Sequence, residues 1–162
     1  MRSFTIRSLL LFLFLALSVP ALAESTRFSV EGETVTDNQS HLMWQKGDSY
    51  HDLQKGLTWY QALEYVDQKN LEQFGGHNDW RLPKMAELAG LWDSSRPLLS
   101  KDREPIGLPG MFTGGGSYYL WSGNERNLDN AWYFGLGQKE DYFNLKELGD
   151  LDQGVKMVRE TK

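Results

Sequence analysis

The stretch from Gly75 to Pro83, with the residues that follow it, constrains the fold more than any other part of the sequence. Two adjacent glycines permit a tight backbone path, and Pro83 suits the first position of a helix, where its missing N–H is not needed. Apolar residues then recur at helical spacing on one face: Met85, Leu88, Ala89 and Trp92. The stretch therefore predicts a turn or strand that passes directly into a packed helix.

The charged residues of this stretch are interpreted as holding the domain together. Asp79 is expected to accept hydrogen bonds from N–H groups near the helix start, and Arg81 to pair with Asp79 or Glu87. The alternative is that Asp79 acts as a metal ligand or an acid. The structural set is Asn78, Asp79, Trp80, Arg81, Pro83 and Glu87.

The first 23 residues have the pattern of a secretory signal peptide. Arg2 and Arg7 precede an apolar run from Leu9 to Leu17, which is too short for a membrane span, and Ala21-Leu22-Ala23 fits a cleavage site. Cleavage after Ala23 would leave one domain, residues 24–162, in the periplasm or outside the cell. An uncleaved anchor is the alternative.

Charge and cysteine content exclude several classes of function. Without Arg2 and Arg7, 15 of the 17 basic residues remain against 22 acidic ones, so the net charge is −7. That charge disfavours nucleic acid and anionic membranes as partners. The chain has no cysteine, which excludes disulfides, thiol nucleophiles, iron–sulfur clusters and cysteine-type zinc sites.

The pattern along the chain predicts an α+β fold. Thr58 is expected to cap a helix that ends near Asn70, and Gln61 completes a capping box. Its apolar stripe is Trp59, Ala62, Leu63 and Val66. The predicted strands lie at 27–30, 34–36 and 42–44, and in an antiparallel meander at 118–122, 131–136, 142–145 and 155–159.

Two segments between these elements are expected to be irregular. Residues 47–56 have the composition of a polar loop. Residues 93–116 hold three prolines and a glycine run, and loops of this length are often functional. The alternative is a packed loop held by Ile106, Leu108, Met111 and Phe112.

The sequence offers little support for a catalytic or metal site. His41, His51 and His77 are far apart and form no zinc motif. The segment Asp150–Gly154 resembles half a calcium loop but lacks the distal glutamate, so it is interpreted as a turn, with weak calcium binding as the alternative. No cofactor is therefore predicted, and whether a metal is bound stays open.

The most polar loop is the candidate ligand-binding site. Amide and carboxylate groups beside tryptophans are what a sugar site needs, since they supply hydrogen bonds and an apolar face for the ring. A solvated hairpin loop is the alternative interpretation. The candidate residues are Trp121, Asn124, Glu125, Arg126, Asn127, Asp129 and Asn130, with Trp132 beside them.

Six short motifs in order resemble one family across residues 28–159. They are Val35-Thr36-Asp37, Leu42-Met43-Trp44-Gln45-Lys46, Thr58-Trp59-Tyr60-Gln61-Ala62-Leu63, Asn78-Asp79-Trp80-Arg81-Leu82-Pro83 with Glu87-Leu88, Tyr119-Leu120-Trp121-Ser122 with Ala131-Trp132-Tyr133, and Val158-Arg159. The chain resembles the DUF1566 domain, also called the Lcl C-terminal domain after a secreted collagen-like adhesin.

The resemblance carries expectations about the fold. Arg81-Leu82-Pro83 with Glu87 is also similar to a segment of the formylglycine-generating enzymes. That similarity implies a C-type-lectin-like fold, with two helices on a twisted antiparallel sheet, a long irregular loop, and terminal strands close together. Those enzymes work through cysteines, so their activity is not carried over. A family disulfide would correspond to Val66 and Met157, which are then expected to touch.

The expected function is an exported, non-catalytic module that binds a glycan, a cell-envelope component or a protein partner through its long loops. The adhesin's domain is associated with sulfated glycosaminoglycans, but a charge of −7 does not favour a polyanion. One alternative is a cysteine-free enzyme, with or without a metal, that uses His77, Asp79 or Glu87. The other is a structural subunit of an envelope assembly.

Overall fold

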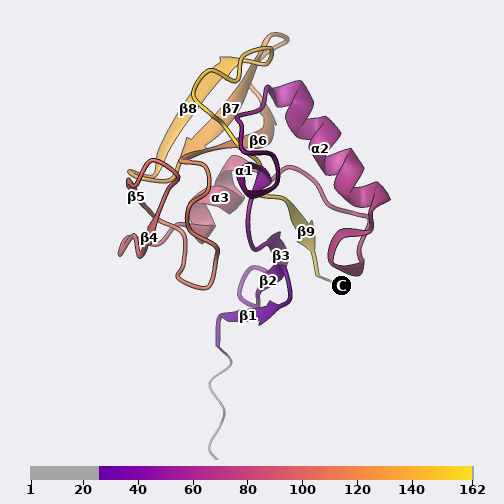
Figure 1. Cartoon of the computed structure of the whole chain (residues 1–162), viewed down its shortest axis with the longest axis vertical. Helices are drawn as coiled ribbons and strands as arrows, with labels where there is room; N and C mark the ends of the chain where they lie inside the picture. The colour runs from indigo at the N-terminus through magenta and orange to yellow at the C-terminus, as the bar shows by residue number, and fades with distance from the viewer. Residues whose placement is uncertain (1–25, 162) are drawn as a thin grey trace, which may run out of the picture.

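The structure is a computed structural model that describes residues 26–161, so the expected signal peptide, residues 1–23, lies outside it. The described residues form an α+β domain with antiparallel sheets and no barrel (Figure 1). The helices are α1 (Ser49–Leu53), α2 (Trp59–Leu71) and α3 (Met85–Leu91), with a short 3-10 turn at Phe74–Gly76.

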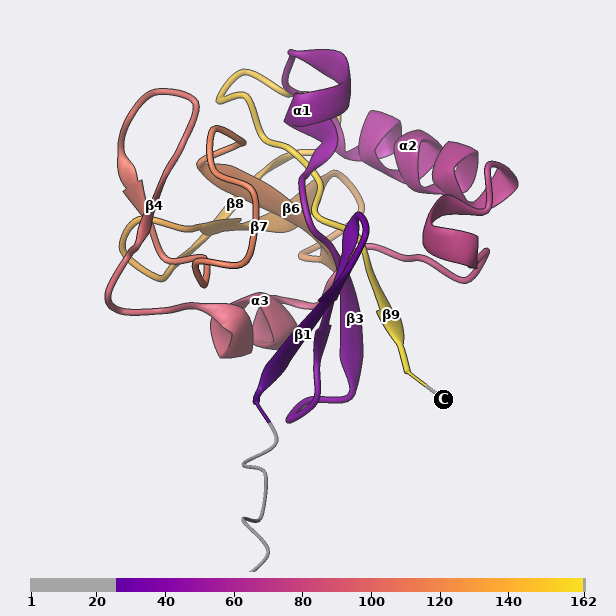
Figure 2. The same ribbon diagram turned by 60° about the horizontal axis from the view of Figure 1, so that its bottom comes forward.

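One sheet joins the two ends of the domain. Its strand order is β1 (Phe28–Glu31), β2 (Thr34–Asp37), β3 (Leu42–Gln45) and β9 (Val158–Glu160), all antiparallel. Figure 2 shows β9 beside β3. The terminal strands thus share a sheet, with β2 and β3 between them.

The prediction that the last strand continues the C-terminal meander is wrong. Val155 and Met157 enter the core on the way to β9, and Val158 exchanges backbone hydrogen bonds with Arg81. Burying these side chains carries the chain away from β8 and onto the edge of the first sheet.

The second sheet is the predicted meander of β6 (Tyr119–Glu125), β7 (Asn130–Gly135) and β8 (Glu140–Leu145). One face packs against α3 and the long loop through Leu120 and Phe134. The other face packs against α2 through Trp121 and Tyr133. The β6–β7 register shifts between Trp121 and Glu125, and such a bulge bends the strand.

One helix starts where the sequence predicts, and two helices differ from the prediction. Thr58 and Gln61 form the predicted capping box of α2, although Tyr65 is buried on its inner face and Leu63 is exposed. The segment predicted as a polar loop contains α1, because Asp48 caps its first turn. Helix α3 begins at Met85, so Pro83 precedes the helix instead of opening it.

The long loop is packed against the domain. It contains two short paired strands, β4 (Leu98–Leu99) and β5 (Pro105–Ile106). Ile106, Leu108 and Phe112 are buried and Met111 is partly buried, as the packed-loop alternative predicts. Val66 and Met157 both belong to the buried cluster between α2 and the β6–β8 sheet.

The Gly75–Pro83 stretch is fixed by two separate ion pairs. Arg81 makes a bidentate pair with Glu87, both distances 2.8 Å, which confirms one of the two expected partners. Asp79 instead pairs with Arg159 on β9 at 2.6 Å, and not with the start of α3. Trp80 is buried and its indole N–H donates to the Phe74 carbonyl.

Candidate functional site

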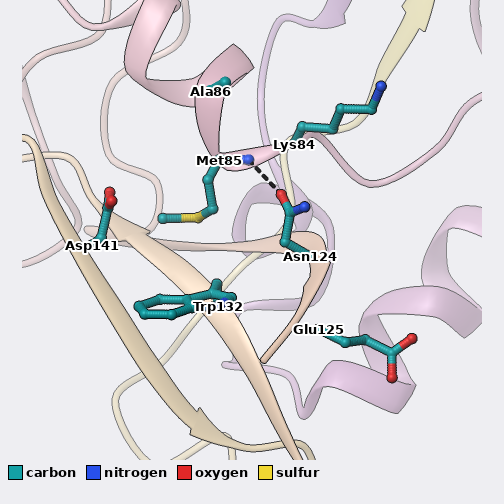
Figure 3. Close-up of a pocket in the computed structure, with 7 residues that line it drawn as sticks. All are labelled: Lys84, Met85, Ala86, Asn124, Glu125, Trp132 and Asp141. Atoms are coloured by element: carbon teal, nitrogen blue, oxygen red, sulfur yellow. Dashed lines mark hydrogen bonds between the residues drawn. The ribbon is translucent and has the colours of Figure 1, made fainter. Parts of the chain in front are cut away.

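A surface groove lies between the first turn of α3 and the β6–β8 sheet (Figure 3). Its volume is about 430 Å³. The lining residues are Lys84, Met85, Ala86, Asn124, Glu125, Trp132 and Asp141. We call it the α3 groove.

An aromatic wall borders this groove. Trp132 lies directly opposite Phe143 in the β7–β8 ladder, with ring centres 5.6 Å apart and the rings edge to face. The Arg126 guanidinium carbon lies 3.5 Å from the centre of the Phe143 ring and 5.7 Å from that of Trp132. Trp132 is half-buried and Phe143 is 46% exposed, so the wall has surface available to a ligand.

Polar groups stand around the wall. The Asn124 side-chain oxygen accepts a hydrogen bond from the Met85 backbone N–H at 2.8 Å, which replaces a missing side-chain cap on α3. Glu125 points away from the other lining residues of the groove (Figure 3). Its carboxylate pairs with Lys146 at 2.5 Å. Asp141, from β8, is exposed at the opposite side of the groove.

The rest of the predicted loop is a tightly bonded turn. The Asn127 side-chain oxygen accepts hydrogen bonds from the backbone N–H groups of Asp129 and Asn130 and from the Asn130 amide. These groups are committed to the hairpin, as the solvated-loop alternative predicts for them. Arg126, Asn124 and Glu125 are the members of the loop that reach the aromatic wall or the groove.

Trp121 is fully buried and offers no surface to a ligand. It lies opposite Tyr133, on the face of the sheet that packs against α2, and its indole N–H donates to the Leu57 carbonyl at 2.7 Å. Trp132, one residue before Tyr133, points to the other face because side chains alternate along a strand. The position expected of Trp121 is therefore held by Trp132.

Sequence reasoning also missed Phe143, Asp141, Lys84 and Met85 as neighbours of this site. The β8 segment alternates between the two faces, and its pairing with β7 could have indicated that Phe143 meets Trp132. The approach of α3 to the sheet has no local signal in the sequence.

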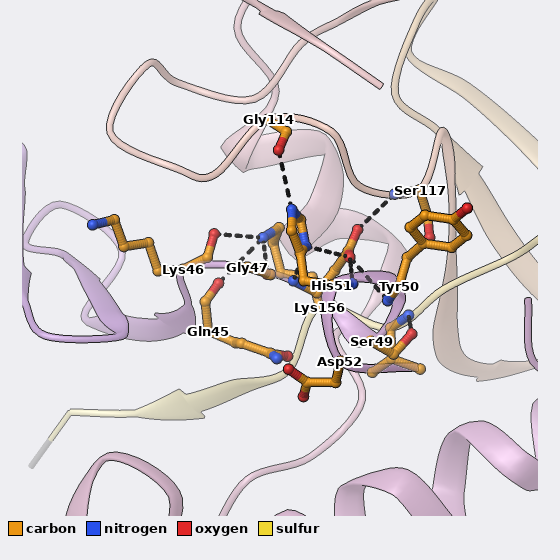
Figure 4. Close-up of polar contacts among 12 residues, drawn as sticks. Gln45, Lys46, Gly47, Ser49, Tyr50, His51, Asp52, Gly114, Ser117 and Lys156 are labelled. Atoms are coloured by element: carbon orange, nitrogen blue, oxygen red, sulfur yellow. Dashed lines mark hydrogen bonds and ion pairs between the residues drawn. The ribbon is translucent and has the colours of Figure 1, made fainter. Parts of the chain in front are cut away.

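A second polar cluster joins the long loop to α1 (Figure 4). Asp48 accepts a hydrogen bond from the Ser117 N–H at 2.7 Å and contacts the His51 ring at 2.8 Å. The other nitrogen of His51 lies 3.0 Å from the Gly114 carbonyl oxygen. The ammonium group of Lys156 is fully buried and donates to the carbonyls of residues 45–47.

Electrostatics in this cluster follow from burial and pairing. The hydrogen bond with Asp48 raises the pKa of His51. Burial opposes ionisation of Asp48, but the His51 hydrogen bond and the charge of Lys156 outweigh it and lower the pKa of the carboxyl group. Burial lowers the pKa of Lys156 to about 8. Because Lys156 is enclosed and His51 and Asp48 are paired, the cluster fixes the long loop to the body of the domain.

The residues of the enzyme and calcium alternatives are engaged elsewhere. Asp79 and Glu87 form the ion pairs described above, and His77 packs edge to face against Trp80. Asp150 accepts from the Asn144 amide and Asp152 pairs with Lys101. Within residues 26–161, no three His, Asp or Glu side chains gather closely enough to hold a metal ion. None of the helices in that range has the length and apolarity of a membrane crossing.

The fold and the groove together define an α+β domain with a loop-bordered surface site. The family model of the Lcl C-terminal domain matches residues 33–159, which is more than half of the chain. The protein therefore belongs to the Lcl C-terminal domain family. No curated protein sequence matches the chain.

Proposed function

We propose that this protein is an exported, non-catalytic binding module that recognises a glycan in the α3 groove. The observation that carries the proposal is the Trp132–Phe143 wall, which stands beside amide, carboxylate and ammonium groups in an open groove. A sugar ring has an apolar face that stacks on an aromatic side chain and hydroxyl groups that bond to the polar rim.

The polar groups at the groove favour recognition over acid–base catalysis. Glu125 is bound to Lys146, so the carboxylate available on the described groove surface is that of Asp141. General acid–base hydrolysis of a glycosidic bond uses two carboxyl groups on either side of the bond. An exposed single carboxylate is better suited to accept hydrogen bonds from ligand hydroxyls.

The location and the finer fold class are part of the same proposal. The signal-peptide pattern of residues 1–23 supports export to the periplasm or the outside. The two packed sheets, the α2 and α3 helices and the long loop support a C-type-lectin-like arrangement. We propose recognition without a cofactor, so calcium should leave the melting temperature unchanged, because Asp150 and Asp152 already have partners.

The test is a glycan array probed with the mature chain and with Trp132→Ala. At least one glycan is expected to bind, and the substitution should weaken binding about tenfold or more, as loss of a central aromatic contact does. Tyr60→Ala is the matched control, because Tyr60 is an exposed aromatic on α2 away from the groove. Absence of any bound glycan, or equal binding by Trp132→Ala, would overturn the proposal.

A protein partner is the second candidate. The β6–β8 sheet and its first hairpin carry exposed apolar side chains: Leu128 is 84% exposed, and Phe143 and Leu145 are each 46% exposed. Neighbouring exposed apolar side chains are a feature of protein-binding surfaces. Leu128→Ser should weaken a protein complex measured by calorimetry while leaving glycan binding intact, and unchanged affinity for the protein would argue against this candidate.

A further inference from the structure

A second groove lies at the start of β6, beside the long loop. Its volume is about 210 Å³, and its lining residues are Lys101, Asp102, Glu104, Tyr118, Tyr119 and Leu151. We call it the tyrosine groove. Tyr133 and Tyr142 are paired one position along from Trp132 and Phe143, so they point away from the α3 groove.

Tyr118 and Tyr119 line this groove, and their rings cluster with that of Tyr142. Tyr119 lies 4.8 Å from Tyr118 and 5.7 Å from Tyr142, measured between ring centres, and both pairs are edge to face. All three side chains are partly exposed. Within residues 26–161, the hydroxyls of Tyr118 and Tyr119 have no hydrogen-bond partner, whereas that of Tyr142 donates to Glu140.

Carboxylates surround the rings. Asp102 and Glu104 line the groove, and Glu140 holds the Tyr142 hydroxyl. Burial, then the neighbouring Tyr119, Glu104 and Glu140, raise the pKa of the Tyr118 hydroxyl. The face of an aromatic ring is itself negative, so rings and carboxylates together make the groove electronegative.

The basic groups near this groove are already engaged. Lys101 pairs with Asp102 at 2.9 Å and with Asp152 at 2.8 Å, and it lies over the ring of Tyr50. Arg96 reaches the Gly137 carbonyl. Neither cation lies over a ring of the cluster.

At several other positions, a Lys or Arg side chain of the protein lies over an aromatic ring. Examples are Arg27 over Phe28, Arg126 over Phe143, Lys139 over Trp92, Lys146 over Trp59 and Lys156 over Phe112. In the described part of the chain, no Lys or Arg lies over Tyr118, Tyr119 or Tyr142. No Lys or Arg of the described chain therefore occupies a ring of this cluster. Tyr142 is stacked on Tyr133 at 5.4 Å, and Tyr118 and Tyr119 are the rings that line the groove.

We propose that the tyrosine groove binds an organic cation of the quaternary ammonium type, with the charged group against Tyr118 and Tyr119 and its charge balanced by Glu104 and Glu140. A methylated ammonium is weakly hydrated and is attracted by ring faces, which is how aromatic cages recognise such groups. The site is separate from the α3 groove and does not depend on the proposed glycan function.

The test is an NMR titration of the folded chain with choline and, separately, with 3,3-dimethylbutan-1-ol, which has the same shape but no charge. Choline should shift the backbone amide signals of Tyr118 and Tyr119 and bind about tenfold more tightly than the neutral compound, because the cation–π attraction needs the charge. Equal binding of the two compounds, or no shift at these amides with choline, would overturn the proposal.

Two variants define the site. Glu104→Gln removes one charge from an exposed side chain and should weaken choline binding several-fold without loss of fold. Tyr118→Leu should weaken it further, with the melting temperature measured as a check on folding. Trp132→Ala, in the other groove, should bind choline normally. The proposal fails if both Glu104→Gln and Tyr118→Leu bind like the wild type, or if Trp132→Ala alone loses binding.

The same chemistry could be presented free in solution or on a lipid headgroup. Phosphatidylcholine vesicles in a sedimentation assay distinguish the two sources. Vesicle binding that free choline displaces supports a surface-bound ligand, whereas binding of choline without vesicle binding supports a small solute. Vesicle binding that choline does not displace and that survives Tyr118→Leu would contradict the assignment to this groove.

Discussion

The side-chain oxygen of Asn124 accepts the backbone N–H of Met85 at 2.8 Å, which ties the β6–β7 hairpin to the first turn of α3. The bond stands at the rim of the α3 groove, so the same side chain positions two walls of the proposed binding site (Figure 3). The shape of the groove is therefore expected to depend on this contact.

Asn124→Ala should destabilise the domain by about 1 kcal/mol, the usual cost of removing a helix-capping side chain. Asn124→Asp keeps an acceptor near the positive end of the helix and should retain most of the stability. Urea denaturation followed by circular dichroism measures both. An Asn124→Ala variant that unfolds at the wild-type urea midpoint would contradict a capping role for Asn124.

Glu87 is expected to stabilise the fold because it binds both the Arg81 side chain and the backbone at the start of α3. Its oxygens accept from Arg81, at 2.8 Å each, and from the Lys84 N–H at 2.7 Å. Glu87→Ala should cost about 2 kcal/mol, since hydrogen bonds to charged groups contribute more than neutral ones. Glu64→Ala, at an exposed position on α2, is the matched control and should change the urea midpoint little.

The His51–Asp48 contact predicts a pH dependence of stability. Because the pKa of His51 is raised on folding, its contribution is fully present below its ordinary pKa of 6.5 and is lost as the pH rises through the folded value. Stability should therefore fall between about pH 6 and pH 8 in the wild type. His51→Gln should flatten that slope.

The pH range of this experiment is limited by Lys156. Its pKa is lowered to about 8, so the folded state releases that proton before the unfolded state and stability rises with pH above this value. Urea midpoints measured below about pH 8 separate the two groups. A His51→Gln variant with the full wild-type slope would show that another group causes it.

Substitution of Gly116 tests how tightly the long loop packs against Asp48. A Cβ atom at this position would overlap the carboxylate of Asp48, which is fixed by Ser117 and His51 and cannot move freely. Gly116→Ala should therefore cost about 1–3 kcal/mol. Gly110→Ala, in the same loop, meets nothing within 4 Å and should be close to neutral in the same denaturation assay.

Local signals allowed much of the fold to be predicted. The capping box of Thr58 and Gln61 is set by residues three positions apart, and the β6–β8 meander by short alternating runs between turns. The pairing of Arg81 with Glu87 also spans only six residues. These features are decided by neighbours in the sequence, which a pattern can capture.

The missed features depend on distant parts of the chain. Residues 155–158 are buried in the core, which places β9 beside β3. Arg159 on β9 then lies close enough to pair with Asp79. Trp121 and Trp132 have similar polar surroundings in the sequence, and only the strand register decides that one is buried and the other faces the groove. The predicted site included Trp121, which is buried, whereas Trp132 of the same hairpin lines the groove.

The central claim is that the α3 groove binds a glycan, and chemical-shift mapping tests it most directly. A glycan identified on the array is titrated into the ¹⁵N-labelled chain. The largest shifts are expected at the Trp132 indole N–H and at the backbone amides of Met85, Asn124 and Asp141. Shifts confined to residues outside the groove, with the Trp132 indole signal unchanged at saturation, would contradict the claim.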